Sequence, residues 1–197
     1  MVAKVASTLA TTEVPGRLAY EVIVCDALVS DAAAIAQIGT ETFTATFGFA
    51  VPDDDLAGFL AKKYSAEAFE AEIVGAQENK ISTFVARDDA SSVLGFVQLV
   101  RGVTDPCLQG EASSHAELQR LYIDVSAQGR GIGSKLIAAV ENQAKAEGFK
   151  LLWLTVWENG SSQQRLYQKL GYVKRGETEF PLGNCVHRDW VMAKTLD

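Results

Sequence analysis

The stretch that decides the fold is "LYIDVSAQGRGIGSKLI", residues 121–137, in which an apolar, strand-like run is followed by a glycine-rich loop and a helix-like run. Gly129, Gly131 and Gly133 surround Arg130 in this loop. A glycine carries no Cβ, so its backbone can come close to a bound group. Successive N–H groups at the start of a helix form a positive concavity that attracts phosphate. The order of strand, glycine loop and helix therefore predicts a cradle for a diphosphate.

Two other phosphate-binding loops fit this stretch less well. A dinucleotide-binding loop follows the pattern GxGxxG, and Ser134 stands where its third glycine is expected. A Walker loop ends in Lys followed by Ser or Thr, whereas here Ser134 precedes Lys135. The remaining alternative is a turn that links the strand to the helix without binding anything.

The composition argues against several classes of protein. The 197 residues are 48% hydrophobic and 22% charged, and no apolar run approaches the roughly 18 residues that a membrane span requires. A formal net charge of -7 disfavours nucleic-acid binding and suits a cationic small substrate. The three cysteines are far apart and form no CxxC pair, so neither a disulfide framework nor a metal site is expected. These features predict a cytoplasmic protein without a membrane or nucleic-acid partner.

The pattern of the remaining segments predicts one mixed α/β domain over residues 18–197, preceded by an irregular arm at 1–17. The arm is poor in basic residues and has no apolar core, which disfavours the alternative of a targeting segment. A strand, helix, strand unit over 115–157 implies a parallel crossover, and 81–102 an antiparallel hairpin. We therefore expect three layers, αβα, with helices on both faces of a mixed sheet. Strands are expected at 19–28, 81–89, 92–102, 115–125, 150–157, 172–180 and 186–194, and helices at 30–43, 44–65 (broken at 48–52), 131–148 and 161–171.

Two motifs in order carry a resemblance to a known family. The first is the stretch at 121–137, which follows the pattern Q/R-x-x-G-x-G/A, and the second is "WENGSSQQRLYQKLGY" at 157–172. Together they resemble the GNAT (GCN5-related N-acetyltransferase) superfamily over residues 19–196. Two positions depart from the family pattern: Ser162 stands where an Asn is frequent, and Val125 where a Pro is usual.

The resemblance implies a fold, a cofactor and a set of residues that bind it. The implied fold is the GNAT acyl-CoA N-acyltransferase fold, with a mostly antiparallel sheet splayed at a central parallel pair. The implied cofactor is acetyl-CoA, the acetyl donor, with no metal. The implied cofactor-binding residues lie on the strand, the loop and the second motif, and are Leu121, Tyr122, Ile123, Val125, Gln128, Gly129, Arg130, Gly131, Ile132, Gly133, Ser134, Ser162, Tyr167 and Lys169.

The chemistry implied by the resemblance assigns three catalytic roles. Tyr167 would give a proton to the departing thiolate, and Glu117 would act through water as the base that deprotonates the amine. The N–H of Ile123 would stabilise the developing oxyanion. Simpler alternatives are a Tyr167 ring packed under the sheet, and a Glu117 carboxylate that is solvated or paired with Arg120 or Lys135.

The acceptor is predicted less sharply than the donor. The segments "TETFTATFG" at 40–48 and "GETEFPLGNCVHRDWVMAK" at 176–194 are similar to PaiA-type polyamine acetyltransferases. We therefore expect direct acetyl transfer to a primary amine, such as a polyamine or another small amine, by a monomer or homodimer. The alternatives are a protein N-terminal or lysine acetyltransferase and a non-catalytic acyl-CoA-binding module.

Overall fold

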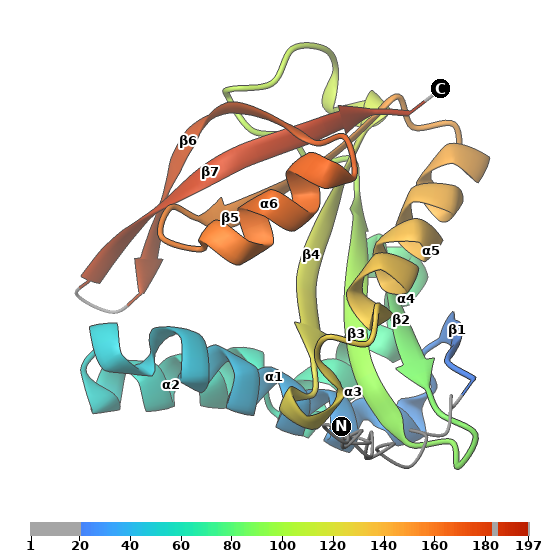
Figure 1. The fold of residues 1–197 in the computed structure, drawn as a ribbon, viewed down its shortest axis with the longest axis vertical. Helices are drawn as coiled ribbons and strands as arrows, with labels where there is room; N and C mark the ends of the chain where they lie inside the picture. Colours follow the sequence, from blue (N-terminus) through green and yellow to red (C-terminus); the bar gives the residue numbers. More distant parts are fainter. Residues whose placement is uncertain (1–20, 183–184, 197) are drawn as a thin grey trace, which may run out of the picture.

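The computed structural model describes residues 21–182 and 185–196, and this part of the chain forms a seven-stranded sheet with the order β1-β2-β3-β4-β5-β7-β6 (Figure 1). The predicted arm at 1–17 lies outside the described residues. Every neighbouring pair of strands is antiparallel except β4 and β5, which are parallel. The strands are β1 (Ile23–Asp26), β2 (Ile81–Arg87), β3 (Val93–Arg101), β4 (His115–Ile123), β5 (Leu151–Trp157), β6 (Val173–Leu182) and β7 (Cys185–Thr195).

Helices cover both faces of the sheet, which confirms the predicted three-layer αβα class. The helix α5 packs on β2, β3 and β4 from one side, whereas α1 packs on β3 and β4 from the other. The short helices α3 and α4 are additional to the expected elements. The α-helices are α1 (Ala32–Phe47), α2 (Asp53–Lys63), α3 (Ala66–Val74), α4 (Ala76–Asn79), α5 (Ile132–Ala146) and α6 (Ser161–Lys169). No helix in the described ranges is both long and apolar enough to cross a membrane.

The hydrophobic core is divided between the two faces. One cluster joins the inner side of α5 to the even-numbered residues of β5, including Leu136, Leu152 and Leu154. The other lies beneath α1 and α3 and includes Ile35 and Phe69, both 0% exposed. Each face is thus held by its own buried side chains, so the sheet between them is a firm support for a site.

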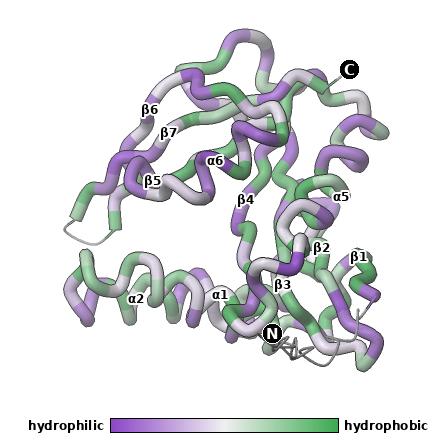
Figure 2. Tube along the Cα trace, viewed as in Figure 1, coloured by the Kyte–Doolittle hydropathy of each residue, from purple (hydrophilic) through white to green (hydrophobic). Residues whose placement is uncertain are grey.

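The parallel pair opens after three residues. Residues 115–117 of β4 pair with residues 151–153 of β5, and beyond them the two strands separate, as Figure 1 shows. The rest of β4 therefore keeps only its partner β3. In Figure 2 the middle of β4 is hydrophilic although much of β3 is hydrophobic, which fits a strand with one edge open at this point. The predicted splay at a central parallel pair is confirmed.

A bulge bends β4 inside this opening. Gln98 of β3 pairs with Gln119 and Phe96 with Tyr122, so β4 carries one extra residue between these two pairs. Within the bulge Arg120 has a φ of 50°, a left-handed conformation that is unfavourable for a residue with a Cβ. A bulge re-aims the backbone that follows it, and here that backbone is the end of β4 leading to the glycine loop.

Candidate active site

The glycine loop joins the end of β4 to the start of α5. Gly129 has a φ of 73° and Gly131, which caps α5, a φ of 76°. A Cβ placed on either residue would meet no atom within 4 Å. The glycines are therefore required by backbone conformation, and the space above them is open. The first N–H groups of a helix have no partner inside it, so those of α5 are available to an anion.

The side chains around this loop have different surroundings. Ile132 is 2% exposed and belongs to the core, so its backbone alone could serve a ligand, while Ser134 and Val125 are exposed. Gln128 Nε2 donates a hydrogen bond of 3.3 Å to the carbonyl oxygen of Ile123. A Cβ on Gly133 would lie 4.0 Å from Leu166 Cδ2 of α6. The first turn of α5 thus lies against α6, the helix that carries the second motif.

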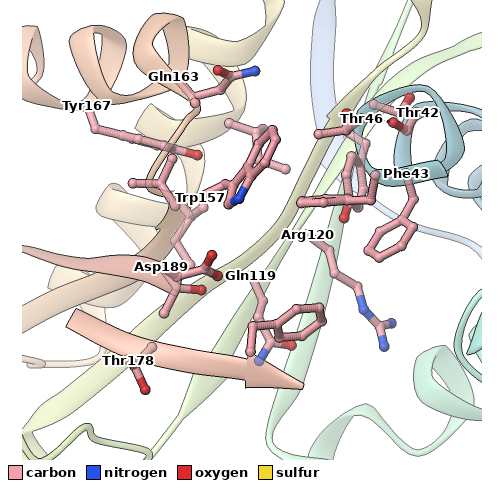
Figure 3. A pocket seen from close by; sticks show the side chains of 18 of the residues that line it. Thr42, Phe43, Thr46, Gln119, Arg120, Trp157, Gln163, Tyr167, Thr178 and Asp189 are labelled. Carbon is pink, nitrogen blue, oxygen red and sulfur yellow. Dashed lines mark hydrogen bonds between the residues drawn. The ribbon is translucent and has the colours of Figure 1, made fainter. Parts of the chain in front are cut away.

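A cavity of about 830 Å³ lies at the opening between β4 and β5. Its wall is formed by residues of α1, α2, β4, β5, α6, β6 and β7, which are far apart in the sequence. Figure 3 shows side chains from these elements facing a common space. Of the predicted site residues, those that line the cavity are Glu117, Leu121, Tyr122, Ser162 and Tyr167.

Tyr167 reaches the cavity from α6. Its ring lies 5.7 Å from that of Tyr172 in an edge arrangement, and the residue is 7% exposed. Figure 3 shows its hydroxyl turned toward the cavity. Burial raises the pKa of this phenol above its ordinary value, so the hydroxyl stays protonated at physiological pH. The simpler alternative holds in part, because the ring is packed in the core while the hydroxyl faces the cavity.

Glu117 is the last β4 residue that pairs with β5, opposite Trp153. It is 8% exposed, and its Oε2 accepts a hydrogen bond of 2.9 Å from Gln119 Nε2. Burial raises the pKa of this carboxyl to about 7, and the nearby Asp105 adds to the effect. A carboxyl with a pKa near 7 is well matched to accept a proton at neutral pH.

The alternative in which Glu117 pairs with Arg120 or Lys135 is wrong. Arg120 Nη1 lies 3.1 and 2.9 Å from the two carboxylate oxygens of Glu72 on α3. Lys135 Nζ donates to the carbonyl oxygen of Val22 at 3.0 Å. Both cations are therefore engaged elsewhere, and Glu117 faces the cavity with Gln119 as its polar neighbour.

The other predicted residues are near the cavity or outside its wall. Ser162 lines it, and its Oγ donates to Gln163 Oε1 at 2.8 Å. Ile123 pairs with Gly95 of β3. Neither Ile123 nor Lys169, which is exposed at the end of α6, is among the lining residues. The lining residues likewise exclude 125–134, so the glycine loop forms a separate open surface beside the cavity.

Sequence reasoning missed an aromatic wall on the cavity. Phe43 and Phe47 of α1 have ring centroids 4.7 Å apart, and Phe59 of α2 lies 5.0 Å from Phe43. Trp157 of β5 lies 5.5 Å from Phe47, and Phe180 of β6 lies 6.1 Å from Phe59. The spacing of Phe43 and Phe47 places them on one face of a helix, but nothing local indicates that β5 and β6 complete the wall.

Comparison with known proteins identifies the class to which this fold and site belong. The model of the Acetyltransferase (GNAT) family matches residues 40–172, and the chain belongs to this family. An uncharacterized N-acetyltransferase in the pepI 3' region of Lactobacillus delbrueckii subsp. lactis is 30% identical over 159 residues, which cover 81% of this chain and 88% of that protein.

Both a sequence match and a structural match come from Thermoplasma acidophilum. A spermidine N(1)-acetyltransferase is 24% identical over 144 residues, covering 73% of this chain and 83% of its own length. The crystal structure of a PaiA N-acetyltransferase in complex with coenzyme A has a TM-score of 0.70 at 23% identity, covering 89% of this chain and 99% of that one. The chain shares its fold with this structure.

Acetyl-CoA is the acetyl donor of the GNAT acetyltransferases, and this chain has a place that fits it. The open space above Gly129 and Gly131 fits a diphosphate, since a side chain at either position would occupy it. The start of α5 lies against α6, which carries Tyr167 in the cavity wall, so the thioester end would lie near Tyr167. The residues suited to hold the cofactor are thus the loop backbone and the end of β4. In the described ranges no group of three His, Cys, Asp or Glu residues is arranged to hold a metal ion.

Proposed function

We propose that this chain transfers an acetyl group from acetyl-CoA directly to a primary amine, and that the acceptor is a small cationic amine of the polyamine class. The observation that carries the proposal is a cavity at the splay of β4 and β5 with a buried carboxyl and a buried phenol in its wall. These two groups have the protonation states that the reaction needs, because the pKa of Glu117 is about 7 and that of Tyr167 is raised.

The residues of the chain divide the work of the reaction. Acetyl-CoA would supply the thioester carbonyl that the amine attacks. Glu117 accepts the proton that the ammonium must lose, directly or through water, and Tyr167 donates a proton to the departing sulfur. The backbone N–H of Ile123 donates toward the carbonyl oxygen. The loop N–H groups at the start of α5 bind the diphosphate.

The charge of the cavity supports a cationic acceptor. Its lining carboxylates are Asp105, Glu117, Glu179 and Asp189, whereas its lining cations are Lys63 and Arg120. Arg120 is already paired with Glu72. The balance is therefore negative where the acceptor would lie, as is the chain as a whole at -7. The similarity to a spermidine N(1)-acetyltransferase supports the same class of acceptor.

An acceptor panel read by release of the CoA thiol tests the proposal. The panel holds spermidine, simple alkylamines, free amino acids, a peptide with a free N-terminus and a peptide with an internal lysine. We expect amine-dependent thiol release that is fastest with the polyamine. Thiol release with a peptide only would contradict a polyamine acceptor and favour a protein acetyltransferase. Binding of acetyl-CoA with no thiol release under any condition would favour a non-catalytic acyl-CoA-binding module.

A further inference from the structure

A second carboxylate in the cavity has no part in the chemistry described above. Asp189 of β7 is 9% exposed and lines the cavity. It stands opposite Trp157 of β5 and Thr178 of β6 in the sheet register. Cross-strand partners point to the same face of a sheet, so Trp157 and Thr178 flank it on that face. Figure 3 shows the Asp189 and Thr178 side chains among those that surround the cavity.

No lysine or arginine of the described residues forms an ion pair with Asp189, and its basic neighbour is the His187 imidazole. In the described part of the chain, the ion pairs involve other carboxylates, namely those of Asp31, Glu72, Glu141, Glu147 and Glu177. The polar neighbours of Asp189 are the Thr155 hydroxyl, the His187 imidazole and the Glu158 carboxylate. Burial raises the pKa of Asp189 above its ordinary value; Glu158 adds to this effect, whereas His187 and the Thr155 hydroxyl oppose it. A buried carboxylate in such surroundings gains from a cation that enters the cavity.

Aromatic rings stand beside this carboxylate. Phe47 and Trp157 form a corner of the cavity wall, with ring centroids 5.5 Å apart. His187 is not a lining residue and packs behind this corner, 5.8 Å from Phe47 and 6.2 Å from Trp157. The face of an aromatic ring attracts an ammonium group, most strongly in the case of Trp. The corner thus offers a carboxylate and an aromatic face to the same cation.

This corner is separated from Glu117 along the sheet. Glu117 stands opposite Trp153, and Asp189 opposite Trp157. Trp153 and Trp157 are four residues apart on β5, which is roughly 13 Å along the strand at about 3.3 Å per residue. Glu117 and Asp189 also lie on opposite sides of β5, in β4 and β7. An acceptor with one amine at Glu117 therefore reaches the corner only if it is long. The cavity wall also includes Phe43 of α1 and Phe59 of α2, whose apolar rings suit an alkyl chain.

We propose that Asp189, with the ring of Trp157, is a subsite for the second ammonium group of a long diamine or polyamine whose first amine reacts near Glu117. The proposal rests on the proposed acetylation of amines, and it adds which residue selects a doubly charged acceptor. Such a subsite raises kcat/KM for α,ω-diamines over monoamines of the same length. It favours long diamines over short ones, because a short chain cannot span the two positions.

The test compares a series of α,ω-diamines with the matching n-alkylamines, in wild type and in Asp189→Asn, by CoA thiol release. The measured quantity is the ratio of kcat/KM for diamine to that for monoamine at each chain length. In wild type we expect a ratio well above one that grows with length. In Asp189→Asn the ratio falls by about tenfold or more, the range expected when a hydrogen bond to a charged group is lost, and Asp189→Glu retains most of it.

Glu158→Gln is the matched control. Glu158 lies close enough to Asp189 to raise its pKa, but it is exposed and outside the cavity wall. Glu158→Gln changes the net charge by the same amount as Asp189→Asn. An equal fall in the diamine-to-monoamine ratio in both variants would therefore indicate a general electrostatic effect and overturn the subsite. A melting curve of each variant verifies that it is folded.

The outcomes separate the subsite from the reaction. The subsite is overturned if wild type acetylates amines without preferring diamines, or if Asp189→Asn keeps the preference. Either result leaves the acetyltransferase assignment intact. Absence of thiol release with every amine overturns the proposed function itself. If Asp189→Asn fails to fold, the chain-length series in wild type decides, since a ratio independent of length contradicts a subsite at a fixed distance.

Discussion

Replacement of Glu117 by Gln should stabilise the chain at alkaline pH while it impairs catalysis. The carboxyl has a pKa of about 7 in the folded chain against an ordinary value of 4.5. The folded chain therefore holds the proton more tightly than the unfolded one. The stability associated with this proton is fully present below about pH 4.5 and is lost as the pH rises through about 7.

The size of the loss follows from the two pKa values. At about 1.36 kcal/mol per pH unit, their difference corresponds to about 3 kcal/mol once the pH is above 7. A glutamine side chain has the shape of a protonated glutamate and carries no charge, so the Glu117→Gln variant escapes this loss. For a chain of this size, a melting temperature changes by about 2–4 °C per kcal/mol. We expect the variant to melt about 6–12 °C higher than wild type at pH 8, and at about the same temperature at pH 4.

The assay is a set of melting curves of both proteins from pH 4 to pH 9, with kinetics on the same samples. The wild-type kcat/KM should rise with pH through about 7, and that of Glu117→Gln should be lower by about 100-fold or more, as for the loss of a general base. A difference in melting temperature that does not change with pH would refute the raised pKa of the buried Glu117 carboxyl. Unchanged kcat/KM in Glu117→Gln would refute its role as the base.

Three further predictions concern other residues of the site. Tyr167→Phe should lower kcat by about 10- to 1000-fold with little change in acetyl-CoA affinity; steady-state kinetics with calorimetry measure this, and an unchanged kcat would assign the proton to another donor. Gly131→Glu should abolish the rise in melting temperature caused by acetyl-CoA. The control is Gly148→Glu, at the other end of α5, because Gly148 has a similar φ of 86° and equally open surroundings. This variant should keep the rise, and loss of the rise in both variants would attribute it to backbone strain. Arg120→Ala should be less stable than Arg120→Gly by about 1 kcal/mol, because both variants lose the ion pair with Glu72 but only glycine adopts the left-handed φ without strain. Urea unfolding measures the difference in stability. Equal stabilities of the two variants would contradict backbone strain at the bulge.

The parts of the fold that depend on local sequence could be predicted. The end of β4, the glycine loop and the start of α5 follow one another in a single stretch of sequence. This stretch is recognisable because the positive φ values and the open helix N-terminus require glycines. Tyr167 could be placed by its spacing to Gly171 in the second motif. The parallel crossover followed from the alternation of strand and helix.

The parts that depend on distant contacts could not be predicted. Arg120 adopts a left-handed φ without being a glycine, and its stabilising partner Glu72 is 48 residues away on α3. The aromatic wall combines α1, α2, β5 and β6, whose rings meet only in the folded chain. Glu117 could be named from the resemblance, but the burial that raises its pKa arises from the assembled cavity. Local pattern thus indicated the glycine loop better than the wall of the cavity.

The most direct test of acetyl transfer at the splay is to quantify acetylated amine by mass spectrometry. Wild type and Tyr167→Phe are each incubated with acetyl-CoA and spermidine, and free CoA thiol is measured in the same samples. We predict that wild type forms acetylated amine in the same amount as thiol, and that the variant forms far less of both. Thiol without acetylated amine, or equal product from the two proteins, would contradict the assignment of this cavity as the site of transfer.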